Sequence, residues 1–308
     1  MNCRHCGEKL QVPFVDLGVA PPSNAYLTEN ALKSPEKWFP LRVLVCTNCW
    51  LVQTEDYVGA EELFSADYAY FSSYSDTWLA HSKLYVQKMI ERFGLNPSSF
   101  VIEVASNDGY LLQYVKAHNI PCLGIEPTMS TALAARAKGI DTIEDFFGVR
   151  LAKNLASQGK YADLMIANNV LAHVPDINDF IQGFAILLKE GGIATFEFPH
   201  LLRLVEEAQF DTIYHEHYSY LSLTAVKHIF EANGLSIFDV EELSTHGGSL
   251  RVYSERKDSG LRKKSPAVET LLKKEKEAGI ETKEFYSTFQ ARAERIKDDL
   301  LIFLIDAK

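Results

Sequence analysis

The sequence contains no run of 18 or more apolar residues, so no membrane-spanning helix is expected. The first six residues, Met1 to Cys6, are polar and lack the apolar core of a secretory signal peptide. Basic residues are scarce, because 31 Lys and Arg stand against 41 Asp and Glu, for a net charge of −10. Nucleic acids and anionic membranes require clustered cations. We therefore expect a cytoplasmic protein that binds neither of them, and we also expect a monomer.

Cysteine is rare as well, but four of the five cysteines form two C-x-x-C pairs, Cys3 with Cys6 and Cys46 with Cys49. A gap of two residues lets both thiolates of a pair reach one tetrahedral zinc ion from a tight turn. Two pairs complete a closed shell of four thiolates, which predicts a structural zinc site. The alternative of two redox motifs lacks the βαβ context of a thioredoxin-like site. Cys122 lies in an apolar stretch and is expected to be a buried core thiol.

A length of 308 residues suggests two domains and part of a third. We expect a zinc-binding domain at 1–75, a second domain at 76–254 and a helical segment at 255–308. The first domain ends in an aromatic stretch, Phe64 to Tyr74, whose side chains either pack between domains or face a ligand cleft. The last segment is rich in Lys and Glu at helical spacing, which predicts a solvated helical face.

Strand and helix patterns alternate through the middle of the chain. Strands are predicted at 99–105, 122–126, near 142, at 162–169 and at 193–198. Helices are predicted at 76–93, 110–118, 130–138 and 177–189, the last stopped by Gly191 and Gly192. This alternation predicts an α/β fold with a doubly wound parallel sheet. Such sheets bind their ligands at the carboxyl ends of the strands.

Polar residues occupy those strand ends. Glu126 follows Glu103 at the spacing of a carboxylate that binds ribose hydroxyls. The glycine pattern that cradles a pyrophosphate is missing, because the turn from Glu103 to Gly109 contains one glycine. This absence argues against NAD or FAD and favours a nucleoside cofactor without phosphates. Asp145 and Phe146 follow the third strand, where they could bind and stack on an adenine ring.

Several longer motifs follow the cysteine pairs in the same order as in one known family. They are E-V-A-S-N-D-G-Y-L-L at 103–112, G-I-E-P at 124–127, N-N-V-L-A-H-V-P-D at 168–176, Y-H-E-H-Y-S-Y at 214–220 and H-G-G-S-L-R-V at 246–252. With them the chain resembles class I S-adenosylmethionine methyltransferases, and most of all the zinc-containing sugar C-methyltransferases that act on nucleotide-linked 4-keto-deoxysugars. Ala105 stands where a generic methyltransferase has glycine. The family also has a longer C-terminal domain, so we expect a short or truncated member.

The resemblance implies a Rossmann-like mixed seven-stranded sheet and a role for each motif residue. The methyl acceptor would be C3 of the sugar, which an enolising base must first deprotonate. His217 is the expected base, because imidazole titrates near neutral pH, and Glu216, Tyr214 and Tyr68 would assist it. The implied substrate contacts are Asn169, His173, Tyr70, His246 and Arg251. The implied S-adenosylmethionine contacts are Glu103, Ser106, Asn107, Asp108, Gly109, Glu126, Pro127, Asp145, Phe146 and Asn168.

Other interpretations of the same residues remain open at this point. His215 and His217 alternate on one face if their segment is extended, so they could bind a metal ion, or the segment could be a structural turn. Gly247 and Gly248 could form a plain hairpin turn, and Arg251 could be an exposed residue of an edge strand. The whole chain could instead methylate oxygen or nitrogen of a sugar or small molecule, or serve as a non-catalytic zinc-ribbon binding module.

Overall fold

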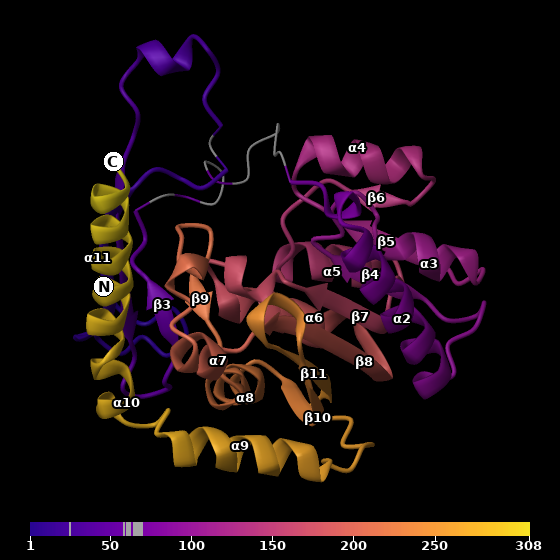
Figure 1. Cartoon of the computed structure of the whole chain (residues 1–308). Coiled ribbons are helices and arrows are strands. Elements are labelled where there is room, and N and C mark those ends of the chain that lie inside the picture. Colours follow the sequence, from indigo (N-terminus) through magenta and orange to yellow (C-terminus); the bar gives the residue numbers. More distant parts are fainter. Residues whose placement is uncertain (25, 58, 60–62, 64–69) are drawn as a thin grey trace.

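The computed structural model describes residues 1–24, 26–57, 59, 63 and 70–308. At its centre lies a seven-stranded sheet in the order β10-β11-β8-β7-β4-β5-β6 (Figure 1). From β8 to β6 the strands are parallel, whereas β11 and β10 are antiparallel to their neighbours. The strands are β4 (Val101–Val104), β5 (Cys122–Ile125), β6 (Thr142–Ile143), β7 (Ala162–Asn168), β8 (Leu188–Pro199), β10 (Leu235–Leu243) and β11 (Ser249–Arg256). The predicted Rossmann-like mixed sheet is confirmed.

Helices cover both faces of this sheet. They are α2 (Asp76–Phe93), α3 (Leu112–Ala117), α4 (Met129–Ala137), α5 (Val149–Ser157), α6 (Ile177–Leu187), α7 (Leu201–Glu206) and α8 (Leu223–Ala232). Alternate side chains of β7 enter opposite cores: Leu164 packs in the core that includes α2 to α4, and Met165 in the core that includes α5, α6 and α8. Because both faces are covered, β7 is apolar along most of its length rather than alternating.

A second, antiparallel sheet carries the cysteine pairs. It joins β1 (Val12–Ala20), β2 (Phe39–Val45) and β3 (Val52–Thr54) to β9 (Ser219–Tyr220), a strand contributed from far along the sequence. The helices α10 (Lys283–Ser287) and α11 (Phe289–Ala307) return to this sheet (Figure 1). The ring of Phe14 on β1 stacks on Phe289 at 4.4 Å between centroids. The N-terminal sheet is therefore completed by residues from the middle and the end of the described chain.

Three local predictions differ from the structure. The helix expected to reach residue 189 ends at Leu187, and β8 starts at Leu188 and runs through the glycine pair. Gly191 has a φ of 74°, and the pairing register with β7 shifts here, so the glycines form an irregularity within the strand rather than a helix stop. Cys122 is only half-buried at the start of β5.

The segment after residue 255 is more than a solvated face. In α9 (Pro266–Ala278), Lys273 and Glu277 are exposed as expected, but Glu275 is fully buried. The carboxylate of Glu275 accepts hydrogen bonds from the backbone N–H groups of Leu223 (2.7 Å) and Thr224 (2.8 Å) at the start of α8. It also pairs with Nε2 of His200 at 2.7 Å. This residue therefore fastens α9 to the end of α8 that carries unsatisfied donors.

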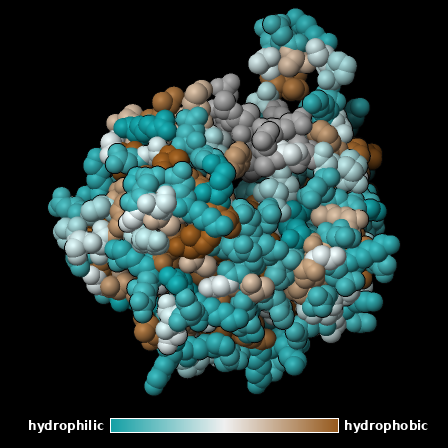
Figure 2. All heavy atoms as spheres, turned by 180° about the vertical axis from the view of Figure 1, so that it is seen from behind, coloured by the Kyte–Doolittle hydropathy of each residue, from teal (hydrophilic) through white to brown (hydrophobic). Residues whose placement is uncertain are grey.

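Figure 2 shows the face of the molecule opposite to that of Figure 1, where hydrophilic side chains dominate and apolar ones form small groups. Among the residues described, every helix is too short or too polar to span a lipid bilayer.

Candidate active site

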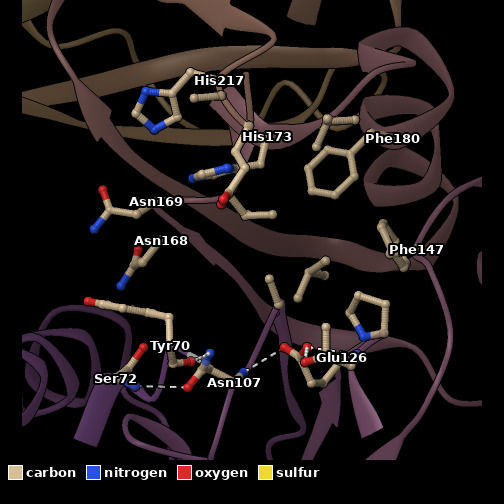
Figure 3. A pocket seen from close by; sticks show the side chains of 18 of the residues that line it. Tyr70, Ser72, Asn107, Glu126, Phe147, Asn168, Asn169, His173, Phe180 and His217 are labelled. Carbon is tan, nitrogen blue, oxygen red and sulfur yellow. Dashed lines mark hydrogen bonds between the residues drawn. The ribbon is translucent and has the colours of Figure 1, made fainter. Parts of the chain in front are cut away.

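A cavity of about 760 Å³ opens at the carboxyl ends of β4, β5 and β7. Figure 3 shows its two ends: Glu126 and Asn107 lie at one, and His173 and His217 at the other, with Asn168 and Asn169 between them. The strand-end rule predicted this location.

The turn after β4 is shaped to hold Glu126, which follows β5. Ala105 and Asn107 both have positive φ (56° and 49°), and this bends the backbone so that the N–H of Asn107 points at the Glu126 carboxylate, at 2.9 Å. The other carboxylate oxygen accepts from the N–H of Thr128 at 3.0 Å. The Asn107 side chain accepts from the N–H of Ser72 at 2.9 Å (Figure 3). Glu126 is thus fixed at the wall of the cavity.

Four of the expected cofactor residues build this turn without lining the cavity in the described structure: Glu103, Ser106, Asp108 and Gly109. Glu103 is fully buried, and burial raises the pKa of its carboxyl well above its usual range. Asp108 pairs with Lys138 at 3.0 Å. Gly109 has a φ of 76°, which a β-carbon would strain.

The remaining expected cofactor residues do line the cavity. Pro127, Asp145 and Phe146 lie beside Glu126, and Asp145 also pairs with Arg150 at 2.6 Å. Asn168, at the end of β7, is buried, and neither atom of its side-chain amide has a hydrogen-bond partner among the described residues. A carboxylate at the end of β5 and a buried amide at the end of β7 fit the ribose and polar groups of S-adenosylmethionine.

The other end of the cavity holds two histidine rings in contact, His173 and His217, with 4.6 Å between centroids. The Nδ1–H of His217 donates to the carbonyl of Thr212 at 2.9 Å, which leaves Nε2 as the acceptor of the Tyr214 hydroxyl, also at 2.9 Å. Burial, with His173 beside it, holds the pKa of His217 well below its usual range. Burial also lowers the pKa of His173 to about 4. Both rings are therefore neutral at pH 7.

The other two residues of the H-E-H motif, His215 and Glu216, have different hydrogen-bond partners from His217, and Glu216 also lines the cavity. The Nε2–H of His215 donates to the carbonyl of Pro40 at 3.1 Å, so the two histidines do not converge on a common ion. Oε1 of Glu216 accepts from the Ser23 hydroxyl at 2.9 Å and from the Asn24 amide at 2.6 Å. Among the described residues, the four cysteines are the only set of three or more candidate ligands whose donor atoms converge.

The expected substrate contacts have mixed outcomes. Asn169, His173, Tyr70 and His246 all line the cavity. Arg251 does not, among the residues described. Its side chain is 4% exposed and ion-paired to Glu197 at 2.9 Å, because β11 lies between β10 and β8 rather than at an edge. Neither a substrate contact nor an exposed edge position agrees with this burial. Tyr68 lies outside the described residues.

Sequence reasoning missed several residues of the cavity wall. Trp78, from the first turn of α2, packs its ring edge-on to His246, and Phe180 of α6 packs edge-on to Phe147. Ser23 and Asn24 reach the cavity from the loop that follows β1. The strand-end rule does not cover these elements. The turn signal at Pro21 and Pro22 predicts that Ser23 and Asn24 lie in a loop, but it does not indicate that this loop faces the cavity.

The four cysteines of the two C-x-x-C pairs converge. All four sulfur atoms lie within 4.8 Å of one another, with 3.6 Å between Cys3 and Cys49 and 3.5 Å between Cys6 and Cys46. Four sulfurs at about 2.3 Å from a tetrahedral zinc ion would be about 3.8 Å apart, so the cluster fits zinc. Both turns use the same geometry: the N–H of Gly7 donates to the backbone carbonyl of Cys3, and the N–H of Trp50 donates to the backbone carbonyl of Cys46.

Comparisons with known proteins agree with this division of labour. Residues 3–64 match a zinc binding domain, 78–240 a methyltransferase domain and 244–308 a C-methyltransferase C-terminal domain. The C-methyltransferase NovU of Streptomyces niveus is 32% identical over 298 residues, which are 96% of this chain and 70% of that protein. The crystal structure of the PH0226 protein of Pyrococcus horikoshii OT3 has the same fold over 61% of this chain and 95% of its own, at 13% identity and a TM-score of 0.51. The chain therefore belongs to the S-adenosylmethionine-dependent C-methyltransferases that carry an N-terminal zinc-binding domain.

Proposed function

We propose that the chain methylates C3 of a nucleotide-linked 4-keto-deoxysugar, through an enolate that His217 generates. The observation that carries the proposal is the half-buried, neutral His217, which shares one cavity with Glu126. A carbon next to a ketone becomes nucleophilic only after it loses a proton, so carbon methylation needs a base inside the methyl-transfer cavity. Methylation of oxygen or nitrogen has no such requirement at carbon.

His217 is suited to this role by its hydrogen bonds. Because Nδ1–H is held by the Thr212 carbonyl, Nε2 is the atom that would take up the C3 proton. The Tyr214 hydroxyl now donates to Nε2. With substrate bound, we expect this hydroxyl to turn to the C4 oxygen and stabilise the negative charge of the enolate there. The low pKa of His217 keeps the ring in its basic form well below pH 7.

The cofactor end would be held by residues that already line the cavity. The carboxylate of Glu126 would bind the ribose hydroxyls, the side-chain amide of Asn168 would bind a polar group of the cofactor, and Asp145 and Phe146 would contact the adenine. When bound, S-adenosylmethionine supplies the electrophilic methyl group. The described lining of the cavity contains no Lys or Arg. We therefore expect the cavity to recognise the sugar ring and the diphosphate to remain outside it.

The test combines cofactor binding with hydrogen exchange. The affinity for S-adenosylmethionine is measured by calorimetry, and the loaded protein is then incubated in D₂O with a dTDP-linked 4-keto-deoxysugar. Deuterium at C3, and a methyl group on C3, are followed by NMR and mass spectrometry. We expect His217→Asn to abolish both, and His228→Asn, on the exposed face of α8, to change neither. Methyl transfer to oxygen or nitrogen without exchange at C3 would refute the proposal.

A further inference from the structure

The first zinc-binding turn reaches beyond the metal site. Between Cys3 and Cys6, the side chain of Arg4 extends away from the sulfurs and is only 5% exposed. Its Nη1 donates to the carbonyl of Pro175 at 3.1 Å, and its Nη2 donates to the carbonyl of Thr54 at 2.9 Å. An arginine fork held by two carbonyls fixes the distance between the two segments that carry them.

Each of those carbonyls is connected to one of the cavity histidines, one through the chain and the other through hydrogen bonds. Pro175 lies two residues after His173. Thr54 ends β3, and its hydroxyl donates to the carbonyl of His217 at 2.6 Å. The N–H of Thr54 also donates to the carbonyl of Tyr218 at 3.1 Å, next to the pairing of β3 with β9. The guanidinium of Arg4 thus links the backbone of the His173 segment to Thr54, and Thr54 in turn binds the backbone carbonyl of His217.

His5, next to Arg4, makes a second contact with the segment that follows His173. The Nδ1–H of His5 donates to the side-chain oxygen of Asn178 at 2.7 Å, and the Asn178 amide donates back to the carbonyl of His5 at 2.8 Å. Asn178 is in the first turn of α6, which follows His173 in the chain. The wall with His173 is therefore tied to the zinc-binding turn at two points.

We propose that Arg4 is a positioning residue for the His173–His217 pair, and that through it the four-cysteine site sets how the two rings meet. An error of about 1 Å in the placement of a reacting group can cost about 100-fold in rate, so a tether of this kind matters even though it touches no substrate. The zinc-binding domain then contributes to the reaction by fixing one wall of the cavity. This inference rests on the proposed function only in assuming that the imidazoles of His173 and His217 take part in the reaction.

Arg4→Gln tests the inference, because glutamine cannot hold both carbonyls. The zinc content of the variant, its affinity for S-adenosylmethionine and the imidazole ¹⁵N shifts of histidine-labelled protein are measured with the whole chain. Asp56→Asn is the matched control, since Asp56 is 52% exposed and contacts the same guanidinium at 2.9 Å. Arg4→Lys keeps the positive charge but is less able to bridge the carbonyls of Pro175 and Thr54. Its histidine signals should therefore lie between those of the wild type and those of Arg4→Gln.

We expect Arg4→Gln to retain zinc and to bind S-adenosylmethionine within about twofold of the wild type. The ¹⁵N signals of His173 and His217 should move, and exchange at C3 should slow by about tenfold or more. Asp56→Asn should change none of these. Unchanged histidine signals in zinc-loaded Arg4→Gln would overturn the inference, whatever the substrate proves to be.

A second variant covers the case in which Arg4→Gln fails to fold. Thr54→Val removes the hydrogen bond from the Thr54 hydroxyl to the carbonyl of His217, which is the last link between Arg4 and His217. It should move the His217 signals while zinc stays bound, and unchanged signals there would equally refute the connection.

Discussion

Acidification should destabilise this protein through His173 and His217, the two half-buried histidines of the cavity. Burial lowers the pKa of His173 to about 4, against an ordinary value of 6.5, so between these values the unfolded chain binds a proton that the folded chain does not. The contribution of the neutral His173 ring to the free energy of unfolding is therefore present above about pH 6.5 and is lost as the pH falls. From pH 7.5 to 5.5, His173 alone should lower the free energy of unfolding by about 1.3 kcal/mol. His217 acts in the same direction.

The assay is urea unfolding at several pH values across that range, followed by fluorescence. His173→Gln should remove about 1.3 kcal/mol of the fall seen in the wild type. His228→Gln, whose ring is exposed on α8, should leave the fall unchanged. Zinc release at lower pH is common to all three proteins, so it cancels in the comparison. An equal fall in His173→Gln and wild type would show that the ring does not stay neutral in the folded state, and the reasoning would fail.

Three further predictions concern single side chains. Glu126→Gln should weaken S-adenosylmethionine binding by about 10- to 100-fold in calorimetry, because the ribose hydroxyls lose a charged acceptor; an unchanged affinity would contradict that role. Tyr214→Phe should lower kcat by about 100-fold or more with unchanged cofactor affinity, since the enolate oxygen loses its donor; an unaltered kcat would rule this out. Glu275→Ala should lower the free energy of unfolding by roughly 3–5 kcal/mol, because it leaves buried donors at α8 and His200 unpartnered. Glu277→Ala, on the exposed side of α9, is its control.

Much of the fold follows from local signals in the sequence. The helix α2 has the predicted bounds, because Ser75 caps its first turn and Gly94 ends it in a left-handed conformation. The central strands are mostly apolar, which is typical of a sheet covered on both faces. The pairing of β9 with β3 could not be predicted, since two residues carry no periodicity and the partner strand is remote in sequence.

In the candidate site, too, the residues placed by local patterns could be predicted, and those placed by long-range contacts could not. Glu126, Asn168 and Asn169 could be predicted because the ends of parallel strands meet at one edge of the sheet. The burial of Arg251 could not, because it depends on the last hairpin inserting β11 beside β8. Arg4 gave no signal either, since a cation beside a cysteine pair is equally compatible with an exposed side chain. Predictions based on local patterns thus located the cavity and missed the long-range contacts that hold its wall.

The pairing of β3 with β9 also has a consequence for the order of events during synthesis. At about 5–20 residues per second, the roughly 165 residues between Thr54 and Tyr220 take a ribosome about 10–30 s. Throughout that time the edge of β3 lacks the strand that will cover it, and an open strand edge invites pairing with other chains. All four cysteines emerge before this interval begins. A zinc ion bound early would keep the nascent N-terminal sheet folded until its last strand arrives.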